Sequence, residues 1–199
     1  MRTLAVVPIK NLSYAKSRLS FLGMQERRHL VLSLLTETID TLKAVMNSDI
    51  VVIGSDRETK EIAARKWIFY LEEKQPGLNT ALFQSAEWAE QSGYFALIVV
   101  PIDLPLLIPD DIFFVLDWTA EGNFMVIAPN SKQNGTNLLC VRLFHNFRFS
   151  FGADSYKRHL DQAAVCGMKS MVYYSFRTCH DIDTYDDWLF WERIVRKER

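Results

Sequence analysis

The feature that most constrains the fold is a continuous apolar run at residues 95–100 that leads directly into an acidic turn. The run reads FALIVV, and Pro-Ile-Asp-Leu-Pro follows at 101–105. An apolar run without polar alternation is typical of a strand that is buried on both faces of an open α/β sheet. Because such sheets bind ligands beyond the carboxyl ends of their strands, Asp103 is a candidate to hold a metal or a substrate. The alternative is that Asp103 only forms the turn.

Apolar runs of strand length alternate with segments of helical periodicity along the chain. Strands are expected at residues 4–9, 49–53, 67–71, 95–100, 124–128, 138–143 and 171–176. Helices are expected at 24–46, 57–66, 77–91, from 109 onward, at 156–166 and at 185–197. This alternation predicts a Rossmann-like three-layer α/β fold with a mostly parallel, doubly wound sheet. No repeat, linker or low-complexity tract interrupts it, so residues 1–199 are expected to form a single domain.

The composition argues against several classes of protein. A net charge of −1 offers no electrostatic attraction to nucleic acid or to an anionic membrane. Every apolar stretch is far shorter than a membrane span, and residues 1–4 lead into a strand without a signal-peptide pattern. The three cysteines are widely spaced, which favours neither a disulfide framework nor a zinc site. A cytoplasmic protein without nucleic-acid or membrane partners is expected.

Three cations follow the first expected strand. Lys10, Lys16 and Arg18 lie within nine residues, in a loop that should extend beyond the carboxyl end of that strand. Three positive charges at this point could neutralise a polyphosphate. A solvated basic loop is the alternative, since Lys and Arg are usually surface residues. The chain has neither the glycine pattern of dinucleotide-binding folds nor the Walker lysine pattern, which argues against these two modes of phosphate binding.

A second acidic segment, HDIDTYDD, lies at residues 180–187. Asp181 and Asp183 alternate along an extended stretch, so both can point to one face. A carboxylate from this segment that met Asp103 would complete an oxygen-rich site for Mg²⁺, which is commonly bound by one or two carboxylates plus substrate phosphates. Residues 184–187 resemble a capping box and suit the first turn of the last helix. Asp183 is therefore the candidate metal ligand, and a role for Asp181 stays open.

Short polar turns supply three further candidates. Ser155 is expected to be the N-cap of the helix at 156–166, where free backbone N–H groups can hold an anion. Gly152 would allow a ligand to approach the backbone closely. Thr136, within the sequence GTN at 135–137, offers a hydroxyl beside a pliant backbone. Ordinary turns commonly have the same composition, so each of these signals is weak alone.

Taken in order, these segments resemble the 2-phospho-L-lactate guanylyltransferase and phosphoenolpyruvate guanylyltransferase family of coenzyme F(420) biosynthesis. The resemblance spans nearly the whole chain, and the ordered set is specific although each piece is not. It is carried by VPIK at 7–10, AKSRL at 15–19, GLNTAL at 77–82, DLPLL at 103–107, GTN at 135–137, Phe151-Gly152 with Ser155 and His159, and DIDT at 181–184.

The resemblance implies a nucleotidyltransferase A-like fold and the Mg²⁺-dependent transfer of GMP from GTP to a small phosphorylated three-carbon acid, with release of pyrophosphate. It also implies metal binding by Asp103 and Asp183, and it is compatible with a homodimer. The catalytic residues that it implies are Lys10, Lys16, Arg18 and Asp103. The nucleotide-binding residues that it implies are Pro8, Lys10, Lys16, Arg18, Gly77, Leu78, Asn79 and Asp103, although Asn79 is nearly as well explained as a helix N-cap. The acceptor-binding residues that it implies are Thr136, Gly152 and Ser155.

Two departures from the family pattern lie near the expected site. Residues 131–134, SKQN, replace a glycine-rich lead into GTN, and Ile102 stands where a small residue is usual. These departures leave open a non-catalytic GTP-binding subunit. A sugar-phosphate or molybdopterin nucleotidyltransferase is a further alternative, but it predicts a glycine-rich loop where this chain has Lys-Asn-Leu-Ser at 10–13. The acceptor is expected to be 2-phospholactate or phosphoenolpyruvate rather than 3-phosphoglycerate.

Overall fold

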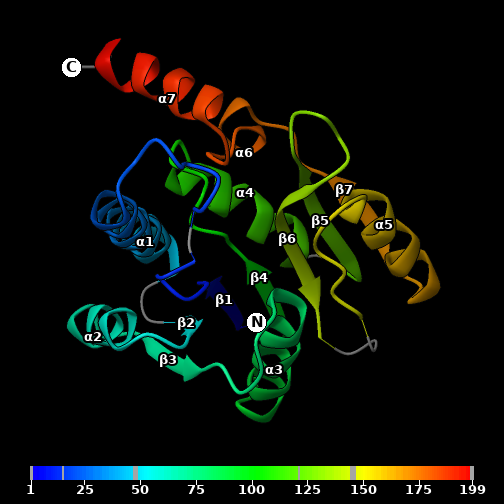
Figure 1. Ribbon diagram of the computed structural model, residues 1–199. Helices are drawn as coiled ribbons and strands as arrows, with labels where there is room; N and C mark the ends of the chain where they lie inside the picture. Colours follow the sequence, from blue (N-terminus) through cyan, green and yellow to red (C-terminus); the bar gives the residue numbers. More distant parts are fainter. Residues whose placement is uncertain (1, 15, 47–48, 121, 144–146, 198–199) are drawn as a thin grey trace.

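One seven-stranded sheet runs through the computed structural model, which describes residues 2–14, 16–46, 49–120, 122–143 and 147–197 (Figure 1). Its strands lie in the order β3-β2-β1-β4-β6-β5-β7. Strand β6 is antiparallel to its neighbours β4 and β5, and the other pairs are parallel. The predicted mostly parallel α/β sheet is confirmed. Ala15, from the AKSRL segment, lies outside the described residues.

The elements alternate along the chain as the sequence predicts. The strands are β1 Thr3–Pro8, β2 Ile50–Gly54, β3 Phe69–Glu72, β4 Ala96–Val99, β5 Phe124–Pro129, β6 Thr136–Arg142 and β7 Lys169–Val172. The helices are α1 Met24–Met46, α2 Arg57–Arg65, α3 Leu78–Gln91, α4 Pro109–Ala120, α5 Ser155–Val165, α6 Phe176–Cys179 and α7 Tyr185–Lys197. None of the helices in the described part of the chain is long and apolar enough to cross a membrane.

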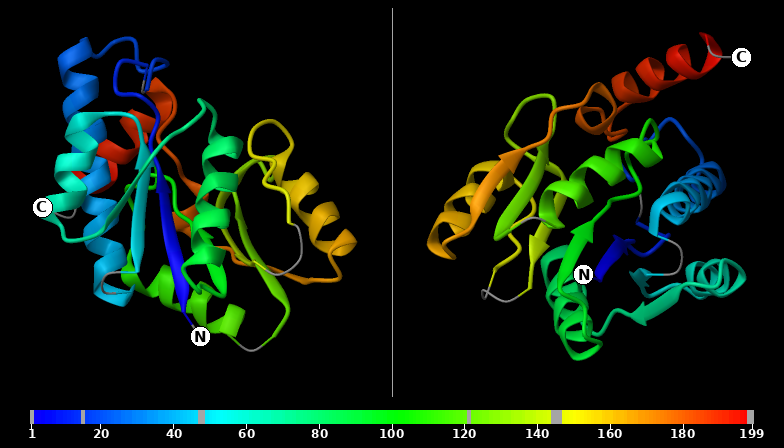
Figure 2. Two further views of the ribbon diagram at one scale, coloured as in Figure 1. Left: turned by 90° about the horizontal axis from the view of Figure 1, so that it is seen from below. Right: turned by 180° about the vertical axis from the view of Figure 1, so that it is seen from behind.

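Consecutive strand residues point to opposite faces of the sheet, and both faces are covered by helices (Figure 2). In β1, Ala5 and Val7 pack into the core beneath α1, α2 and α4, whereas Leu4 and Val6 pack into the core beneath α3 and α5. All four side chains are fully buried. Because neither face of the central strands meets water, these strands carry continuous apolar runs rather than alternating patterns, whereas the edge strands β3 and β7 are partly exposed. The two cores hold the strand ends in fixed positions.

The carboxyl ends of the parallel strands lie at one edge of the sheet. Loops leave this carboxyl edge after β1, β2, β3, β4, β5 and β7. Because β6 runs in the opposite direction, its first residue, Thr136, lies at the same edge. The candidate residues after β1, after β4, before β6 and after β7 therefore share one side of the molecule.

Most strand boundaries shift by one or two residues from the prediction, and two of the differences have a clear local cause. Strand β3 begins at Phe69 rather than at residue 67, because Trp67 has a left-handed φ of 55° and is largely exposed. Strand β7 ends at Val172, and the short helix α6 follows where an extended chain was expected. Ser175 caps α6, since its hydroxyl accepts a hydrogen bond from the backbone N of Thr178 at 3.1 Å. Local capping thus ends the extended segment.

The last helix packs on the loop after β1. Trp188 and Trp191 of α7 lie against a small core formed by Leu19, Leu30, Leu34 and Ile182. Beyond this contact α7 extends outward from the body of the molecule (Figure 1). The contact holds the segment that contains Asp183 against the loop that contains Lys16.

A buried carboxylate fixes the position of α6. Asp111 of α4 is fully buried and accepts hydrogen bonds from Tyr173 Oη at 2.7 Å and from Arg177 Nε at 2.7 Å and Nη2 at 2.9 Å. Burial alone would raise the pKa of Asp111, but the hydrogen bonds from Arg177 and Tyr173 outweigh it and lower the pKa below its usual value. This network ties α4 to α6 and to the chain that leads to Asp181.

We expect Asp111→Ala to lower the free energy of unfolding at pH 7 by about 2–4 kcal/mol, because it removes the buried acceptor that binds Tyr173 and Arg177. Denaturant unfolding measures the loss. Since folding lowers the pKa of Asp111, the stabilisation that its ionised carboxylate provides is complete above the pKa of the unfolded carboxyl group. It is lost as the pH falls through the lower pKa of the folded state. The control is Glu61→Ala, which removes an exposed pair with Arg57 and should cost less than about 0.5 kcal/mol. Equal losses in the two variants would contradict the prediction.

Candidate active site

The carboxyl edge brings Asp103 and Asp183 to one cation, the side chain of Lys16. Its Nζ lies 3.4 Å from Asp103 Oδ2 and 3.1 Å from Asp183 Oδ1, and it also donates to the backbone oxygen of Ile182. The Lys16 side chain is only 8% exposed. Burial lowers the pKa of Lys16, but the two carboxylates outweigh it and raise the pKa, so the ammonium stays charged. The expected meeting of Asp103 and Asp183 is confirmed, while their metal-binding role remains a prediction.

A third carboxylate adjoins this pair. Burial, followed by the negative charges of Asp103 and Asp183, raises the pKa of Asp181 above its usual value. Asn137 Nδ2 donates to Asp181 Oδ1 at 3.3 Å and to the backbone oxygen of Thr178 at 2.9 Å, which holds Asp181 in place. The three carboxylates make the edge strongly negative and suited to a cation.

Backbone and capping interactions align the acidic segment. The backbone N of Ile182 donates to the backbone oxygen of Asp103 at 2.9 Å, so the two acidic segments run side by side. The backbone N of Thr184 donates to Asp187 Oδ2 at 2.7 Å, and the backbone N of Asp187 donates to Thr184 Oγ1 at 3.3 Å. The predicted capping box is confirmed, and it leaves Asp183 available to face Asp103.

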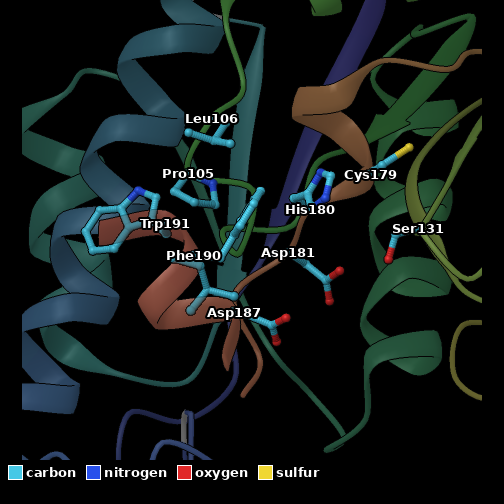
Figure 3. A pocket seen from close by; sticks show the side chains of 10 residues that line it. Pro105, Leu106, Ser131, Cys179, His180, Asp181, Asp187, Phe190 and Trp191 are labelled. Atoms are coloured by element: carbon cyan, nitrogen blue, oxygen red, sulfur yellow. The ribbon is translucent and has the colours of Figure 1, made fainter. Parts of the chain in front are cut away.

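A small cavity adjoins the acidic residues. It has a volume of about 30 Å³ and is lined on its polar side by Ser131, Asp181 and Asp187 and on its aromatic side by Phe190 and Trp191 (Figure 3). A space of this size accommodates a water molecule rather than a nucleotide. This cavity is therefore too small to be the nucleotide site.

The three predicted cations occupy different environments. Only the Lys16 side chain is inserted among the carboxylates. Arg18 is 76% exposed, with Nη1 3.6 Å from Asp183 Oδ2, and Lys10 is exposed just beyond Pro8, the last residue of β1. Lys10 and Arg18 are thus placed to meet a ligand that approaches the edge from solvent.

The predicted nucleotide-binding residues of α3 lie beside the predicted acceptor-binding loop. The Asn79 side chain accepts from the backbone N of Phe151 at 2.8 Å and donates to the backbone oxygen of Phe151 at 3.1 Å. Gly77, with φ of 135°, is the N-cap of α3, and Asn79 follows Leu78 inside the helix. The interpretation of Asn79 as an N-cap is therefore wrong, because its amide is used to bind the 151–152 turn.

Buried hydrogen bonds orient the hydroxyls of Thr136 and Ser155. The backbone N of Thr136 donates to Ser155 Oγ at 2.9 Å, and the backbone N of Ser150 donates to His159 Nε2 at 2.9 Å. An imidazole whose Nε2 accepts must carry its proton on Nδ1, so Nδ1 donates to Thr136 Oγ1, 2.9 Å away. Both hydroxyl oxygens thus already accept a hydrogen bond, and both residues are buried, Ser155 at 1% exposure and Thr136 at 8%. Ser155 is the first residue of α5 after Asp154, so its predicted N-cap role is wrong.

The first two residues of β6 connect the acidic residues with the predicted acceptor site. Thr136 forms hydrogen bonds with Ser155 and His159, whereas its neighbour Asn137 forms a hydrogen bond with Asp181. Gly152, exposed and with φ of 117°, lies next in sequence to the Phe151 held by α3. The structure therefore brings the predicted residues together as two groups, one on each side of the start of β6.

Both departures from the family pattern have a structural explanation. In the turn before β6, Asn130 Oδ1 accepts from the backbone N of Asn134 at 3.1 Å and of Gly135 at 3.0 Å, and Gln133 takes a φ of 55°. An asparagine side chain thus orders a turn that lacks its usual glycines. Ile102 packs against two hydrophobic cores, which accommodate its larger side chain.

Two residues that order the candidate site were not predicted from the sequence. Asn137 was expected only as part of a pliant turn, and its partner Asp181 lies 44 residues away, beyond the reach of any local pattern. The resemblance includes His159 without a role, and the structure places it as the donor to Thr136. The sequence feature that could have indicated Asn137 is its position next to the candidate residue Thr136 in the segment GTN.

His159 generates a pH prediction. Burial, with a smaller contribution from Arg158, lowers the pKa of His159 from 6.5 to about 4. The unfolded imidazole gains its proton near pH 6.5, whereas the folded imidazole stays neutral until about pH 4. Protonation between these values favours the unfolded state, so the free energy of unfolding keeps its full value above pH 6.5 and falls by about 3 kcal/mol as the pH falls to about 4. We expect denaturant unfolding of His159→Asn to lack this component, so that the stability difference between wild type and variant narrows over this range. A difference that is constant with pH would contradict the prediction.

Comparisons with known sequences place the chain in a family. The family model described as guanylyl transferase CofC like matches residues 3–194. A phosphoenolpyruvate guanylyltransferase from Rubrobacter xylanophilus is 34% identical over 188 residues, which cover 94% of this chain and 92% of the relative. A 2-phospho-L-lactate guanylyltransferase from Methanocaldococcus vulcanius is 30% identical over 190 residues, which cover 92% of this chain and 81% of the relative.

Solved structures share the fold at low sequence identity. A putative nucleotide-diphospho-sugar transferase from Desulfovibrio desulfuricans G20 has a TM-score of 0.79 at 15% identity, covering 98% of this chain and 88% of its own. A nucleotidyl transferase from Methanothermobacter thermautotroptrophicus has a TM-score of 0.69 at 16% identity, covering 98% and 99%. These likenesses confirm the nucleotidyltransferase-like fold. With the family match over nearly its whole length, the chain belongs to the guanylyl transferase CofC-like family and is a nucleotidyltransferase.

Proposed function

We propose that this protein transfers GMP from GTP to phosphoenolpyruvate or 2-phospho-L-lactate, with release of pyrophosphate, as a step in coenzyme F(420) biosynthesis. The observation that carries the proposal is the convergence of Asp103 and Asp183 on the side chain of Lys16, with the exposed Arg18 beside Asp183 and the exposed Lys10 in the same loop. Reaction between two polyanions requires cations that neutralise their charge, and these lysine and arginine side chains, with a metal ion held by the carboxylates, would supply them. The two relatives described above are named for these two acceptors.

The acidic residues fit Mg²⁺ as the cofactor. Asp103 and Asp183 already hold a cation between them. Among the described residues, no group of three or more His, Cys, Asp or Glu side chains is arranged to bind a metal ion alone. The remaining ligands would be phosphate oxygens and water, as is usual for Mg²⁺. When bound, Mg²⁺ supplies charge neutralisation on the phosphates.

In the proposed reaction, an acceptor phosphate oxygen forms a bond to the α-phosphorus of GTP, and the bond from that phosphorus to the oxygen of pyrophosphate breaks. The protein contributes orientation and charge, because the acceptor itself is the nucleophile. Lys10, Lys16 and Arg18 would bind the triphosphate and the leaving pyrophosphate. The hydrogen bonds between Asn79 and Phe151 would set the distance between nucleotide and acceptor.

The acceptor acid requires donors for both a phosphate and a carboxylate. Thr136 and Ser155 offer hydroxyl protons whose oxygens already accept hydrogen bonds, and Gly152 offers an exposed backbone. Donors of this kind bind anions without a buried unpaired cation. Phosphoenolpyruvate and 2-phospho-L-lactate share a skeleton, so the same donors suit both, whereas 3-phosphoglycerate carries its phosphate one carbon further along.

The function is tested by a matrix of GTP, ATP and CTP against phosphoenolpyruvate, 2-phospho-L-lactate, 3-phosphoglycerate and a hexose 1-phosphate, with products identified by mass. We expect product from GTP with phosphoenolpyruvate or 2-phospho-L-lactate. Equal use of ATP or CTP would contradict the guanine preference. Turnover of the hexose phosphate alone would indicate a sugar-phosphate enzyme. Nucleotide binding without product from any acceptor would indicate a GTP-binding subunit.

Asp103→Asn should reduce pyrophosphate release at least about a hundredfold, because it removes a charge that helps hold the metal at the reacting phosphates. The matched control is Asp117→Asn, which neutralises an exposed carboxylate of α4 near the amino ends of β1 and β4. The control should retain wild-type activity. Activity of Asp103→Asn within a few-fold of wild type would remove Asp103 from the catalytic site.

Ser155→Ala should raise the KM for the acceptor acid and leave the KM for GTP nearly unchanged. The variant removes one hydroxyl donor and also the acceptor of the Thr136 backbone N–H, so acceptor binding should weaken by about 1–3 kcal/mol. Ser85→Ala is the control, since it removes a buried hydroxyl whose partner is the helix backbone of α3. A rise in KM confined to GTP would assign the 152–155 loop to the nucleotide instead.

A further inference from the structure

Lys16 occupies the position that a metal ion would need. Its Nζ is bonded to Asp183, Asp103 and the backbone oxygen of Ile182, three oxygen groups that would otherwise face a divalent cation. The loop that carries Lys16 lies against the segment leading into α7, where Leu19 and Ile182 share a core (Figure 1). The ammonium is thus delivered to the acidic residues by the fold itself.

The ammonium and a divalent cation cannot share this position. Both need the same carboxylate oxygens, and their like charges repel strongly at contact distance in a partly buried site. The exposed Arg18 lies 3.6 Å from Asp183 Oδ2, farther than the 3.1 Å between Lys16 Nζ and Asp183 Oδ1, so it competes far less. A metal ion can therefore bind between Asp103 and Asp183 only after Lys16 withdraws.

The loop is suited to such a withdrawal. Lys16 has a φ of 51°, a left-handed conformation that residues other than glycine rarely adopt. The side chain is held by the carboxylates and by one backbone oxygen, and its stem is long and flexible. A triphosphate beside the acidic residues would offer the ammonium a second set of anionic oxygens close by.

We propose that Lys16 is an exchangeable internal cation, which blocks the divalent-metal site in the nucleotide-free protein and moves to the triphosphate when metal and nucleotide bind together. This inference rests on the proposed function, since it assumes a nucleoside triphosphate as the ligand. It assigns Lys16 two successive anionic partners. The binding of metal and the binding of nucleotide are then mutually dependent. The triphosphate attracts Lys16 away from the metal site, and the metal ion neutralises the carboxylates that Lys16 leaves.

The test is binding of Mn²⁺, measured by the electron paramagnetic resonance signal of the free ion, to the full-length protein without nucleotide. We expect Lys16→Met and Lys16→Gln to bind Mn²⁺ at least about tenfold more tightly than wild type, because the competing charge is gone. Lys16→Arg, which keeps the charge, should resemble wild type. Lys10→Met removes the same charge from an exposed position in the same loop, and its Mn²⁺ affinity should also match wild type. Adding Asp103→Asn to Lys16→Met should abolish the gain.

A second measurement compares the effect of GTP on Mn²⁺ binding in the same two proteins. GTP should increase the Mn²⁺ affinity of the wild type much more than that of Lys16→Met, where no internal cation has to leave. Equal Mn²⁺ affinities of wild type and Lys16→Met, or Mn²⁺ binding by nucleotide-free wild type as tight as with GTP, would overturn the inference. Failure of the proposed function gives a different result: no product in the acceptor matrix, while the gain of Mn²⁺ affinity on loss of Lys16 persists.

Discussion

Three carboxylates at one edge of the sheet repel one another, so the site requires a cation that compensates their charge. Asp103, Asp181 and Asp183 are brought together by the fold, and burial together with the other two charges raises the pKa of Asp181. Lys16 provides the compensating charge, and its own pKa is raised by the same carboxylates against the effect of burial. A site that gathers negative charge in this way binds cations, whether an ammonium of the chain or a metal ion.

Interactions distant from the site hold these charges together. Asp111 binds Arg177 and Tyr173 and so fixes α6 against α4. From α6 the chain passes through Asp181 to the capping box that starts α7, whose tryptophans pack on the loop after β1. The acidic residues therefore depend on a half-buried ion pair and an aromatic contact, neither of which touches a substrate in the proposed reaction.

The antiparallel strand β6 joins the two halves of the site. In a fully parallel sheet, the start of this strand would lie at the opposite edge; because β6 is reversed, Thr136 and Asn137 enter at the carboxyl edge. The backbone N of Thr136 donates to Ser155 Oγ and its hydroxyl accepts from His159 Nδ1, while Asn137 Nδ2 donates to Asp181. The short GTN segment at 135–137 thus contacts both groups of candidate site residues.

The sequence by itself determined the alternation of strands and helices, because doubly buried strands require continuous apolar runs and helices require their own periodicity. It also determined that Asp103, Asp183 and the basic loop lie at one edge, since parallel strands end together. Only the tertiary structure decided that Lys16 is inserted between the two carboxylates, that Asn79 binds the 151–152 turn and that Ser155 accepts from Thr136 instead of capping its helix. Each of these contacts joins segments far apart in the chain, and side-chain partners at such separations are selected by packing and charge in three dimensions rather than by any local pattern.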